Sequence, residues 1–146
     1  MKLYSIFLIV LLVGCIHRSD NPEYNYTIIN NSGKDVSFIP YSYGVAKPEN
    51  KVFLLNGKSL NESNHDFHGI SMGTLLFGNT FNGLTHIEIV FSNEKKVKYE
   101  ECSSTFNCNL QDRNILNSQY NGELTETYTI TPEDYQNATP CNGNCY

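Results

Sequence analysis

The sequence lacks tryptophan, carries little charge and contains no apolar run long enough to form a membrane-spanning helix. Only 17% of its 146 residues are charged. The longest apolar stretch, residues 3–13, falls short of the about 20 residues that a spanning helix needs. Basic residues are few, ten against fifteen acidic ones. The resulting net charge of -5 argues against a nucleic acid as the partner, and the length is enough for one domain but not for two well-buried cores.

Asparagine and tyrosine are abundant, and they favour β structure with many turns. The chain has nineteen asparagines and ten tyrosines but only two alanines, although alanine is the best helix former. From residue 24 onward, apolar and polar residues alternate with a period of two in short segments separated by turn residues. The sequence therefore predicts an all-β domain over residues 24–138, a single antiparallel β-sandwich or barrel of six to eight short strands.

Turn residues between the alternating segments predict which strands pair. Three hairpins are expected: residues 24–41, residues 51–63 around Asn56-Gly57, and residues 85–100 around the turn 92–95. Near the C-terminus, Thr131 followed by Pro132 and two acidic residues has the form of a helix start. A short helical turn is therefore expected after the last strand.

The inward-facing members of the alternating segments are the expected core. They are Tyr26, Ile28, Val36, Phe38, Val52, Leu54, Ile87, Ile89, Val97, Tyr99, Tyr128 and Ile130. Residues 64–83 and 101–121 show no clear pattern. Residues 139–146 form a cysteine-containing tail with almost no apolar side chains, and this tail is expected to fray unless something ties it down.

The N-terminal segment has the form of a signal peptide and ends in a recognisable motif. Lys2 precedes the apolar run, which closes with Leu12-Val13-Gly14-Cys15. This motif resembles the lipobox of bacterial lipoproteins, in which the chain is cut just before a cysteine whose sulfur receives a diacylglyceryl group. The resemblance implies a signal peptide over residues 1–14 and lipidation of Cys15. The membrane is then a partner through the lipid anchor.

The resemblance to bacterial lipoproteins also implies a location in the cell envelope. Residue 16 is isoleucine rather than the aspartate that retains many lipoproteins at the inner membrane, which favours the outer membrane. Residues 15–23 comprise the lipidated cysteine and a polar tether, and its eight residues after Cys15 cannot reach beyond about 30 Å. The stretches 26–33, 88–99 and 128–135 further resemble small uncharacterised lipoproteins of Bacteroidota-type bacteria, which implies an all-β, lipid-anchored domain without a known activity.

Four cysteines remain once Cys15 carries lipid: Cys102, Cys108, Cys141 and Cys145. Their even number and the oxidising compartment favour two disulfides over free thiols, and their spacing is unlike the Cys-x-x-Cys pattern typical of zinc sites. Sequence proximity favours the local pairing, Cys102–Cys108 and Cys141–Cys145. Crossed pairing stays open as the alternative, because it would close longer loops and remove more unfolded-state entropy.

Three histidines form a candidate metal cluster. His65 and His68, with His86 further along the chain, would have to converge, but two histidines three residues apart share a face only on a helix. Asn64 and Gly69 disfavour a helix there, so the histidines are interpreted as surface residues, and no metal or cofactor is expected. No catalytic residue is expected either. No cysteine is left over as a nucleophile, and the acidic pairs 100–101 and 133–134 are explained by strand alternation and by the helix start.

Two classes of function remain open. The favoured one is a membrane-anchored, non-catalytic binding or accessory module of the envelope with another envelope protein as its partner. A variant of this class is an inhibitor or immunity-type lipoprotein that neutralises another protein. The alternative class is a small metal-dependent hydrolase that uses His65, His68 and His86. Because the first class is favoured, the sequence predicts a protein that is not an enzyme.

Overall fold

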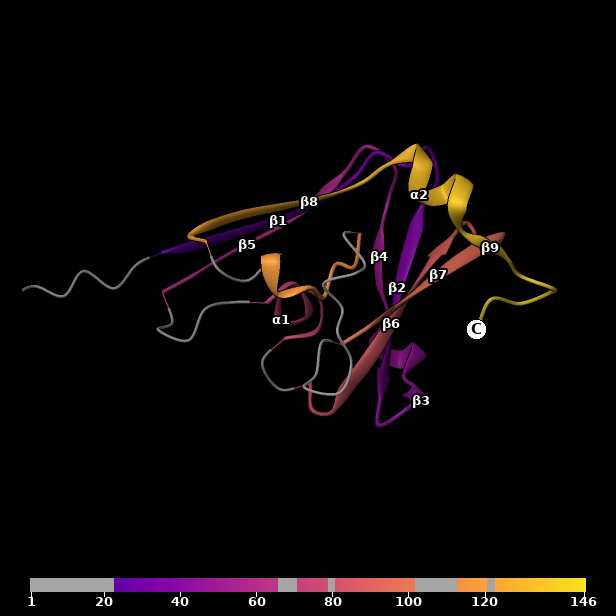
Figure 1. Ribbon diagram of the computed structural model, residues 1–146, viewed down its shortest axis with the longest axis horizontal. Coiled ribbons are helices and arrows are strands. Elements are labelled where there is room, and N and C mark those ends of the chain that lie inside the picture. Colours follow the sequence, from indigo (N-terminus) through magenta and orange to yellow (C-terminus); the bar gives the residue numbers. More distant parts are fainter. Residues whose placement is uncertain (1–22, 66–70, 79–80, 102–112, 121–122) are drawn as a thin grey trace, which may run out of the picture.

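Figure 1 shows a computed structural model of the chain, which describes residues 23–65, 71–78, 81–101, 113–120 and 123–146. Its strands are β1 (Tyr24–Asn30), β2 (Val36–Ser42), β3 (Val45–Ala46), β4 (Val52–Leu54), β5 (Ser59–Asn64), β6 (Leu84–Phe91), β7 (Lys95–Glu100), β8 (Thr125–Ile130) and β9 (Thr139–Pro140). Two α-helices, α1 (Met72–Phe77) and α2 (Pro132–Asn137), and the 3-10 turns η1 (Pro48–Asn50) and η3 (Ser118–Tyr120) complete the described elements. None of these helices is long and apolar enough to cross a membrane.

The strands form two sheets with one core between them (Figure 1). Sheet A has the order β5-β1-β8, and sheet B has the order β3-β2-β6-β7-β9 with β4 paired to β2. All pairings are antiparallel except that of β1 with β8, which is parallel. A parallel pair needs a long connection, and here most of the domain lies between the two strands. The all-β fold with a short C-terminal helix is confirmed.

One cluster of buried side chains fills the space between the sheets. It contains ten of the twelve predicted core residues, and the other two, Val52 and Val97, pack against it while partly buried. The remaining buried members were not among the predicted core residues, although Phe91 continues the alternation of Ile87 and Ile89: Met72, Leu75 and Leu76 on α1, Phe91 at the end of β6, Ile115 and Leu116 before η3, and Ala138 after α2. Helix α1 lies in a stretch of scattered glycines, and it begins where the Ser71 hydroxyl accepts from the N–H of Thr74 at 3.0 Å.

Tyr26 contributes a buried hydroxyl without a partner to this core. Its side chain is fully buried, and its oxygen makes no hydrogen bond to any described residue. A desolvated polar group without a partner costs free energy, so Tyr26→Phe is expected to leave the unfolding free energy unchanged or raise it by about 1 kcal/mol. Urea denaturation followed by circular dichroism measures this.

The matched control for that substitution is Tyr128→Phe. The hydroxyl of Tyr128 donates to the carbonyl oxygen of Arg113 at 2.8 Å, so its loss is expected to cost about 1 kcal/mol. If Tyr26→Phe destabilised the protein as much as Tyr128→Phe does, the Tyr26 hydroxyl would have to be bonded in solution.

The hairpin predicted over residues 24–41 is wrong. β1 pairs with β5 and β8 in sheet A, whereas β2 pairs with β3, β4 and β6 in sheet B, so the turn between them carries the chain from one sheet to the other. The fully buried Asn30 holds this crossing. Its amide donates to the carbonyl oxygens of Lys34 (2.8 Å) and Leu54 (3.0 Å), and its Oδ1 accepts from the N–H and the hydroxyl of Ser32. The side chain thus provides local bonds that compete with a hairpin ladder.

The hairpin predicted over residues 51–63 is wrong for a related reason. Asn56-Gly57 does form a turn, with Gly57 at a φ of 74° and the N–H of Lys58 bonded to the carbonyl of Leu55 at 3.1 Å. However, β4 before the turn belongs to sheet B and β5 after it belongs to sheet A. A turn signal shows where the chain changes direction but not which strand each arm pairs with.

The third hairpin and the C-terminal helix are confirmed. β6 and β7 pair in antiparallel fashion around a turn in which Ser92 and Asn93 both have positive φ. The Thr131 hydroxyl accepts from the N–H of Asp134, and the Asp134 carboxylate accepts from the N–H of Thr131 at 2.7 Å. This capping box explains why α2 starts where the sequence indicates.

The tail is tied to sheet B. β9 pairs with β7, and the N–H of Cys141 donates to the carbonyl of Glu94 at 2.9 Å. Cys145 is buried against Ile39 and Val90. The tail is therefore held in place by contacts with sheet B, which the sequence pattern did not reveal.

Candidate functional site

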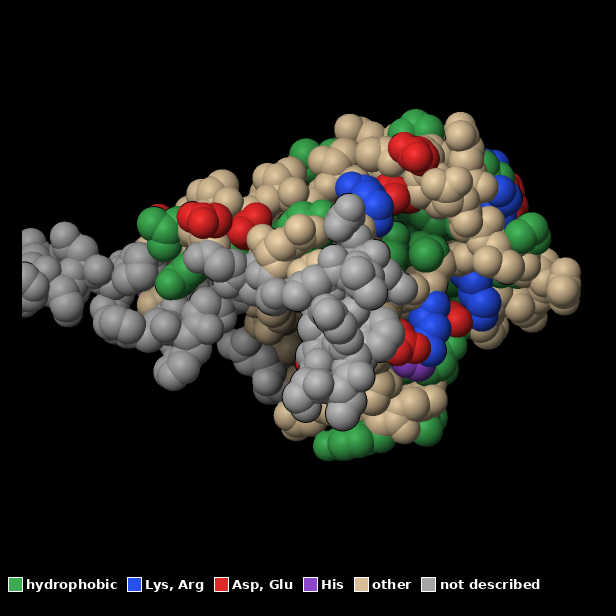
Figure 2. Space-filling model, in the orientation of Figure 1, with side chains coloured by type: hydrophobic (Ala, Val, Ile, Leu, Met, Phe, Trp, Pro, Cys, Tyr) green, Lys and Arg blue, Asp and Glu red, His purple; other side chains and the backbone are tan. Residues whose placement is uncertain are grey.

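The candidate site is the outer face of sheet B, the side that points away from the core. Strand alternation places on it the side chains of Ile39 and Tyr41 from β2, His86, Glu88 and Val90 from β6, and Lys96 and Lys98 from β7. Figure 2 shows positive and negative side chains gathered together over this part of the molecule. The outer face therefore concentrates titratable groups on rigid strands.

One half of the outer face is covered by the tail. Cys145 packs on Ile39 and Val90 as a second, smaller apolar cluster. Two polar contacts hold it there: the Nζ of Lys96 donates to the carbonyl of Cys145 at 3.1 Å, and the N–H of Cys145 donates to the Oδ1 of Asn93 at 3.1 Å. The tail is thereby a fixed part of the outer face.

A disulfide closes this tail on itself. Cys141 and Cys145 are bonded, as expected from the local pairing, with their Cα atoms 5.1 Å apart. Cys102 and Cys108 lie outside the described residues, and so does Cys15. The pairing of the first two and the lipidation of the third stay predictions.

Glu88 is the buried charge at the centre of the outer face. Its residue is only 7% exposed, yet its carboxylate is matched by two donors, the Nζ of Lys96 at 2.9 Å and the hydroxyl of Tyr41 at 3.0 Å. Burial, together with the hydrogen bond to Glu88, raises the pKa of Tyr41 to about 12. Alternation with the inward-facing Ile87 and Ile89 places Glu88 on the outer face, but the sequence does not reveal its partners, because they lie on two neighbouring strands.

His86 stacks on Tyr41 at the open half of the outer face. The two ring centroids are 3.9 Å apart with an angle of 24° between the planes. Burial first, and the positive charge of Lys98 second, lower the pKa of His86 below its ordinary value. Its ring is therefore neutral at neutral pH. The adjacent Lys98 is paired with Glu100 at 2.6 Å, which leaves the open half with balanced charge.

Removal of the Tyr41 hydroxyl provides a pH-dependent prediction. Folding raises the pKa of Tyr41 from 10.0 to about 12. The contribution of its hydroxyl to the unfolding free energy is therefore fully present below pH 10 and is lost as the pH rises to about 12. The difference in unfolding free energy between the wild type and Tyr41→Phe should therefore be largest below pH 10. The difference should shrink towards pH 12 in urea denaturation curves, and a difference that is constant across this range would contradict the raised pKa.

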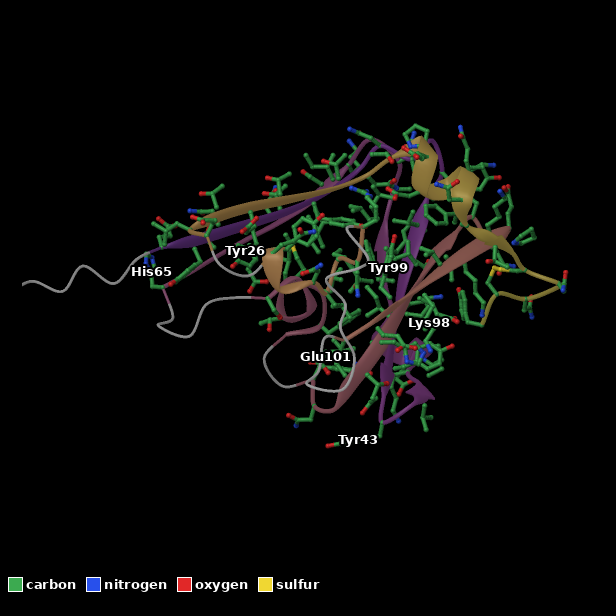
Figure 3. The ribbon with its side chains drawn as sticks, viewed as in Figure 1. Tyr26, Tyr43, His65, Lys98, Tyr99 and Glu101 are labelled. Atoms are coloured by element: carbon green, nitrogen blue, oxygen red, sulfur yellow. A yellow bond between two sulfur atoms is a disulfide. The ribbon has the colours of Figure 1, made fainter. Side chains whose placement is uncertain are left out.

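The two candidate metal ligands that the structure describes, His65 and His86, do not converge. His65 lies at the far end of sheet A, whereas His86 is on β6 next to the strand that carries Lys98 (Figure 3). His68 lies outside the described residues. Within the described part of the chain, no group of three or more His, Cys, Asp or Glu side chains could hold a metal ion.

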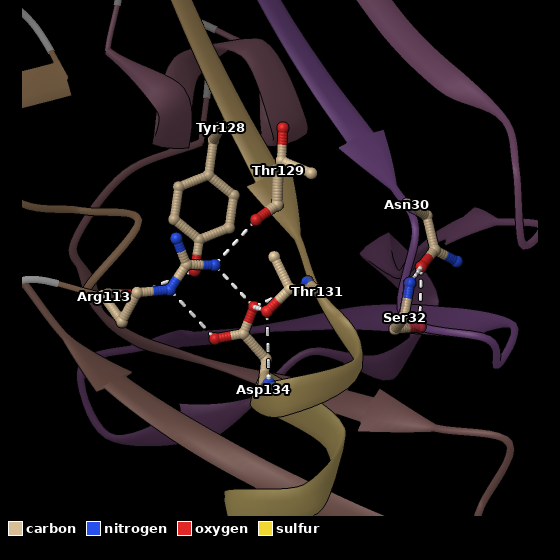
Figure 4. A network of polar contacts seen from close by, with 7 residues as sticks. All are labelled: Asn30, Ser32, Arg113, Tyr128, Thr129, Thr131 and Asp134. Carbon is tan, nitrogen blue, oxygen red and sulfur yellow. Dashed lines mark hydrogen bonds and ion pairs between the residues drawn. The ribbon is translucent and has the colours of Figure 1, made fainter.

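One member of each predicted acidic pair, Glu100 and Asp134, has a side-chain partner. Glu100 binds Lys98, while burial raises the pKa of Glu101. Asp134 caps α2 and also pairs with the guanidinium of Arg113, which in turn donates to the carbonyl of Thr129 (Figure 4). The Arg113 guanidinium lies 5.0 Å from the centre of the Tyr128 ring. This network, which the sequence did not predict, fastens α2 to the segment before η3.

Two short sequence patterns associated with serine hydrolases occur in the chain, and the expectation of no catalytic residue ignored both. Residues 69–73 read Gly-x-Ser-x-Gly, but the hydroxyl of Ser71 caps α1 and contacts the hydroxyl of Thr74. Ser92 and Lys95 have Ser-x-x-Lys spacing, but Lys95 donates to the carbonyls of Tyr135 and Gln136. In the described part of the chain neither serine contacts a base.

A third hydroxyl does contact a histidine. The Oγ1 of Thr85 lies 3.3 Å from the Nδ1 of His86, the residue next to it. The same oxygen donates to the carbonyl of Tyr41 at 3.2 Å and accepts from the N–H of Gly44 at 3.1 Å. The Thr85 hydroxyl therefore binds backbone groups at the irregular end of the β2–β6 pairing, where the register shifts between Tyr41 and Ser42.

Comparison of the chain with protein-family models, with curated proteins and with solved structures gives no match. The chemistry of the outer face itself therefore indicates what it can do. A rigid sheet face with a fixed tail, an aromatic stack and mutually neutralised charges is suited to recognition of a partner.

Proposed function

We propose that this protein is a lipid-anchored, non-catalytic binding or accessory module of a bacterial cell envelope, with another envelope protein as its partner. The observation that supports this most is the Cys141–Cys145 disulfide, because disulfides persist in oxidising compartments outside the cytoplasm. The lipobox-like motif that ends in Cys15 supplies the means of attachment, and Ile16 favours the outer membrane.

The anchor would orient the domain relative to its membrane. β1 begins at Tyr24, so only the eight residues 16–23 separate Cys15 from sheet A, a span of at most about 30 Å. Figure 1 shows the start of β1 at one end of the domain and α2 with β9 at the other. The end of sheet A at Tyr24 therefore faces the bilayer in this proposal, and the tail is turned away from it.

The experiment uses the full chain expressed in a Gram-negative host fed with an alkyne analogue of palmitate. The expected result is a protein that carries the alkyne label, and whose tail peptide is disulfide-linked in non-reducing peptide mapping. Crosslinking in intact cells of the bacterium that naturally makes the protein should then yield a reproducible adduct with one envelope protein. An unlabelled protein with reduced cysteines would contradict the location, and a labelled protein without any protein adduct would contradict the binding role.

A further inference from the structure

A slot of about 310 Å³ lies on the outer face of sheet B beside the tail. Its floor follows one cross-strand row, in which Ser37 on β2 has Phe53 of β4 on one side and Val90 of β6 on the other. The hollow exists because a small serine lies between two larger side chains. Its volume is at the lower end of the range found for small-ligand sites.

We propose that this slot binds a neutral pyranose sugar. The walls are two aromatic side chains that the protein itself leaves partly in water: Phe53 is 58% exposed and Tyr146 is 48% exposed. Both are large enough to cover the C–H face of a sugar ring, and the area still exposed is what a ligand would bury. The inference goes beyond the envelope role and does not depend on the lipid anchor.

The polar groups of the slot match a ligand that is neutral and carries both donors and acceptors. Asp35 and Lys51 contribute one charge of each sign, so a ligand with a net charge gains from one and is repelled by the other. Asp35 uses one carboxylate oxygen to accept from the N–H of Asn56 at 2.9 Å, and its second oxygen is bonded to no described residue. That oxygen can accept from a sugar hydroxyl, and the hydroxyl of Ser37 and the amide nitrogen of Asn93 can donate to one.

The Tyr146 wall is held in place by its neighbours. The Nζ of Lys51 donates to the Tyr146 hydroxyl at 3.3 Å and lies 5.3 Å from the ring centre. The preceding residue, Cys145, is fixed by its disulfide and by its contacts with Lys96 and Asn93. A pre-positioned wall lowers the ordering cost of binding, so reduction of the disulfide should weaken the sugar affinity.

The test is saturation-transfer NMR on the full-length protein in a detergent without a sugar headgroup. The probes are methyl β-D-glucopyranoside, methyl α-D-mannopyranoside and N-acetylglucosamine, with glucosamine and glucuronate as charged counterparts. At least one neutral probe should bind with a dissociation constant on the order of 1 mM, and Phe53→Ala and Tyr146→Ala should each weaken it about tenfold. Tyr43→Ala, which removes a 79% exposed tyrosine that does not line the slot, should leave the affinity unchanged.

The remaining outcomes separate the parts of the inference. A thiol reductant, or Cys141→Ser with Cys145→Ser, should weaken binding of the neutral probe, and this arm tests the wall that the disulfide holds. Saturation transfer to none of the neutral probes, or transfer that Phe53→Ala leaves unchanged, would overturn the proposal. Preferential binding of glucosamine or glucuronate would overturn it as well, because the charge argument would then be wrong.

Discussion

Replacing Cys15 with Ala is expected to release nearly all of the protein from the membrane fraction or to leave its precursor uncut. The physical reason is that the apolar run over residues 3–13 is too short to span a bilayer, so stable attachment depends on acyl chains. Each buried methylene contributes about 0.8 kcal/mol, and two or three chains together hold a protein firmly where one does not. Fractionation of cells that express the full chain, with immunoblotting of both fractions, measures the effect.

The matched controls for this substitution are the other cysteines. Cys102→Ser and Cys141→Ser remove a thiol outside the lipobox-like motif of residues 12–15, so both variants are expected to stay in the membrane fraction and to be cut normally. A mature, membrane-bound Cys15→Ala protein would refute the lipid anchor. Loss of Cys141→Ser from the membrane would show instead that folding, and not lipidation, controls the fractionation.

The strands and most of the core could be predicted because both depend on a local pattern. The sequence of β6 alternates Ile87 and Ile89 with His86 and Glu88, and a tight turn makes β6 and β7 neighbours in sequence as well as in space. The same holds for the capping box of α2, whose members Thr131 and Asp134 are three residues apart.

The sheet arrangement and the candidate site could not be predicted because they depend on contacts between distant residues. Nothing local distinguishes a turn that closes a hairpin from a turn that changes sheets, and both failed hairpins are of the second kind. Glu88 has its partners on β2 and β7, and the slot needs a serine, a phenylalanine and the last tyrosine to meet. Sequence spacing does not reveal such contacts, since strand pairing is set by the whole fold.

Asn30 is the residue on which the change of sheet depends, and its replacement is expected to have a large effect on stability. Its side chain is fully buried and makes all four of its possible hydrogen bonds, two as donor and two as acceptor. The backbone of the same residue bonds Gly57 and Lys58, so both chain crossings meet here. Truncation would leave the carbonyls of Lys34 and Leu54 without these donors at a buried point.

Asn30→Ala is therefore expected to lower the unfolding free energy by about 3 kcal/mol, since each buried group left unsatisfied costs roughly 1–3 kcal/mol. The matched control is Asn31→Ala: Asn31 is exposed, so its truncation should change stability by no more than about 0.5 kcal/mol. Asn30→Asp keeps the acceptor for Ser32 but turns a carboxylate towards two carbonyl oxygens, so it should cost at least as much as alanine at neutral pH. Urea denaturation of the three variants measures these changes in unfolding free energy. Equally small decreases for Asn30→Ala and Asn31→Ala would show that the crossing between the sheets does not depend on the Asn30 side chain.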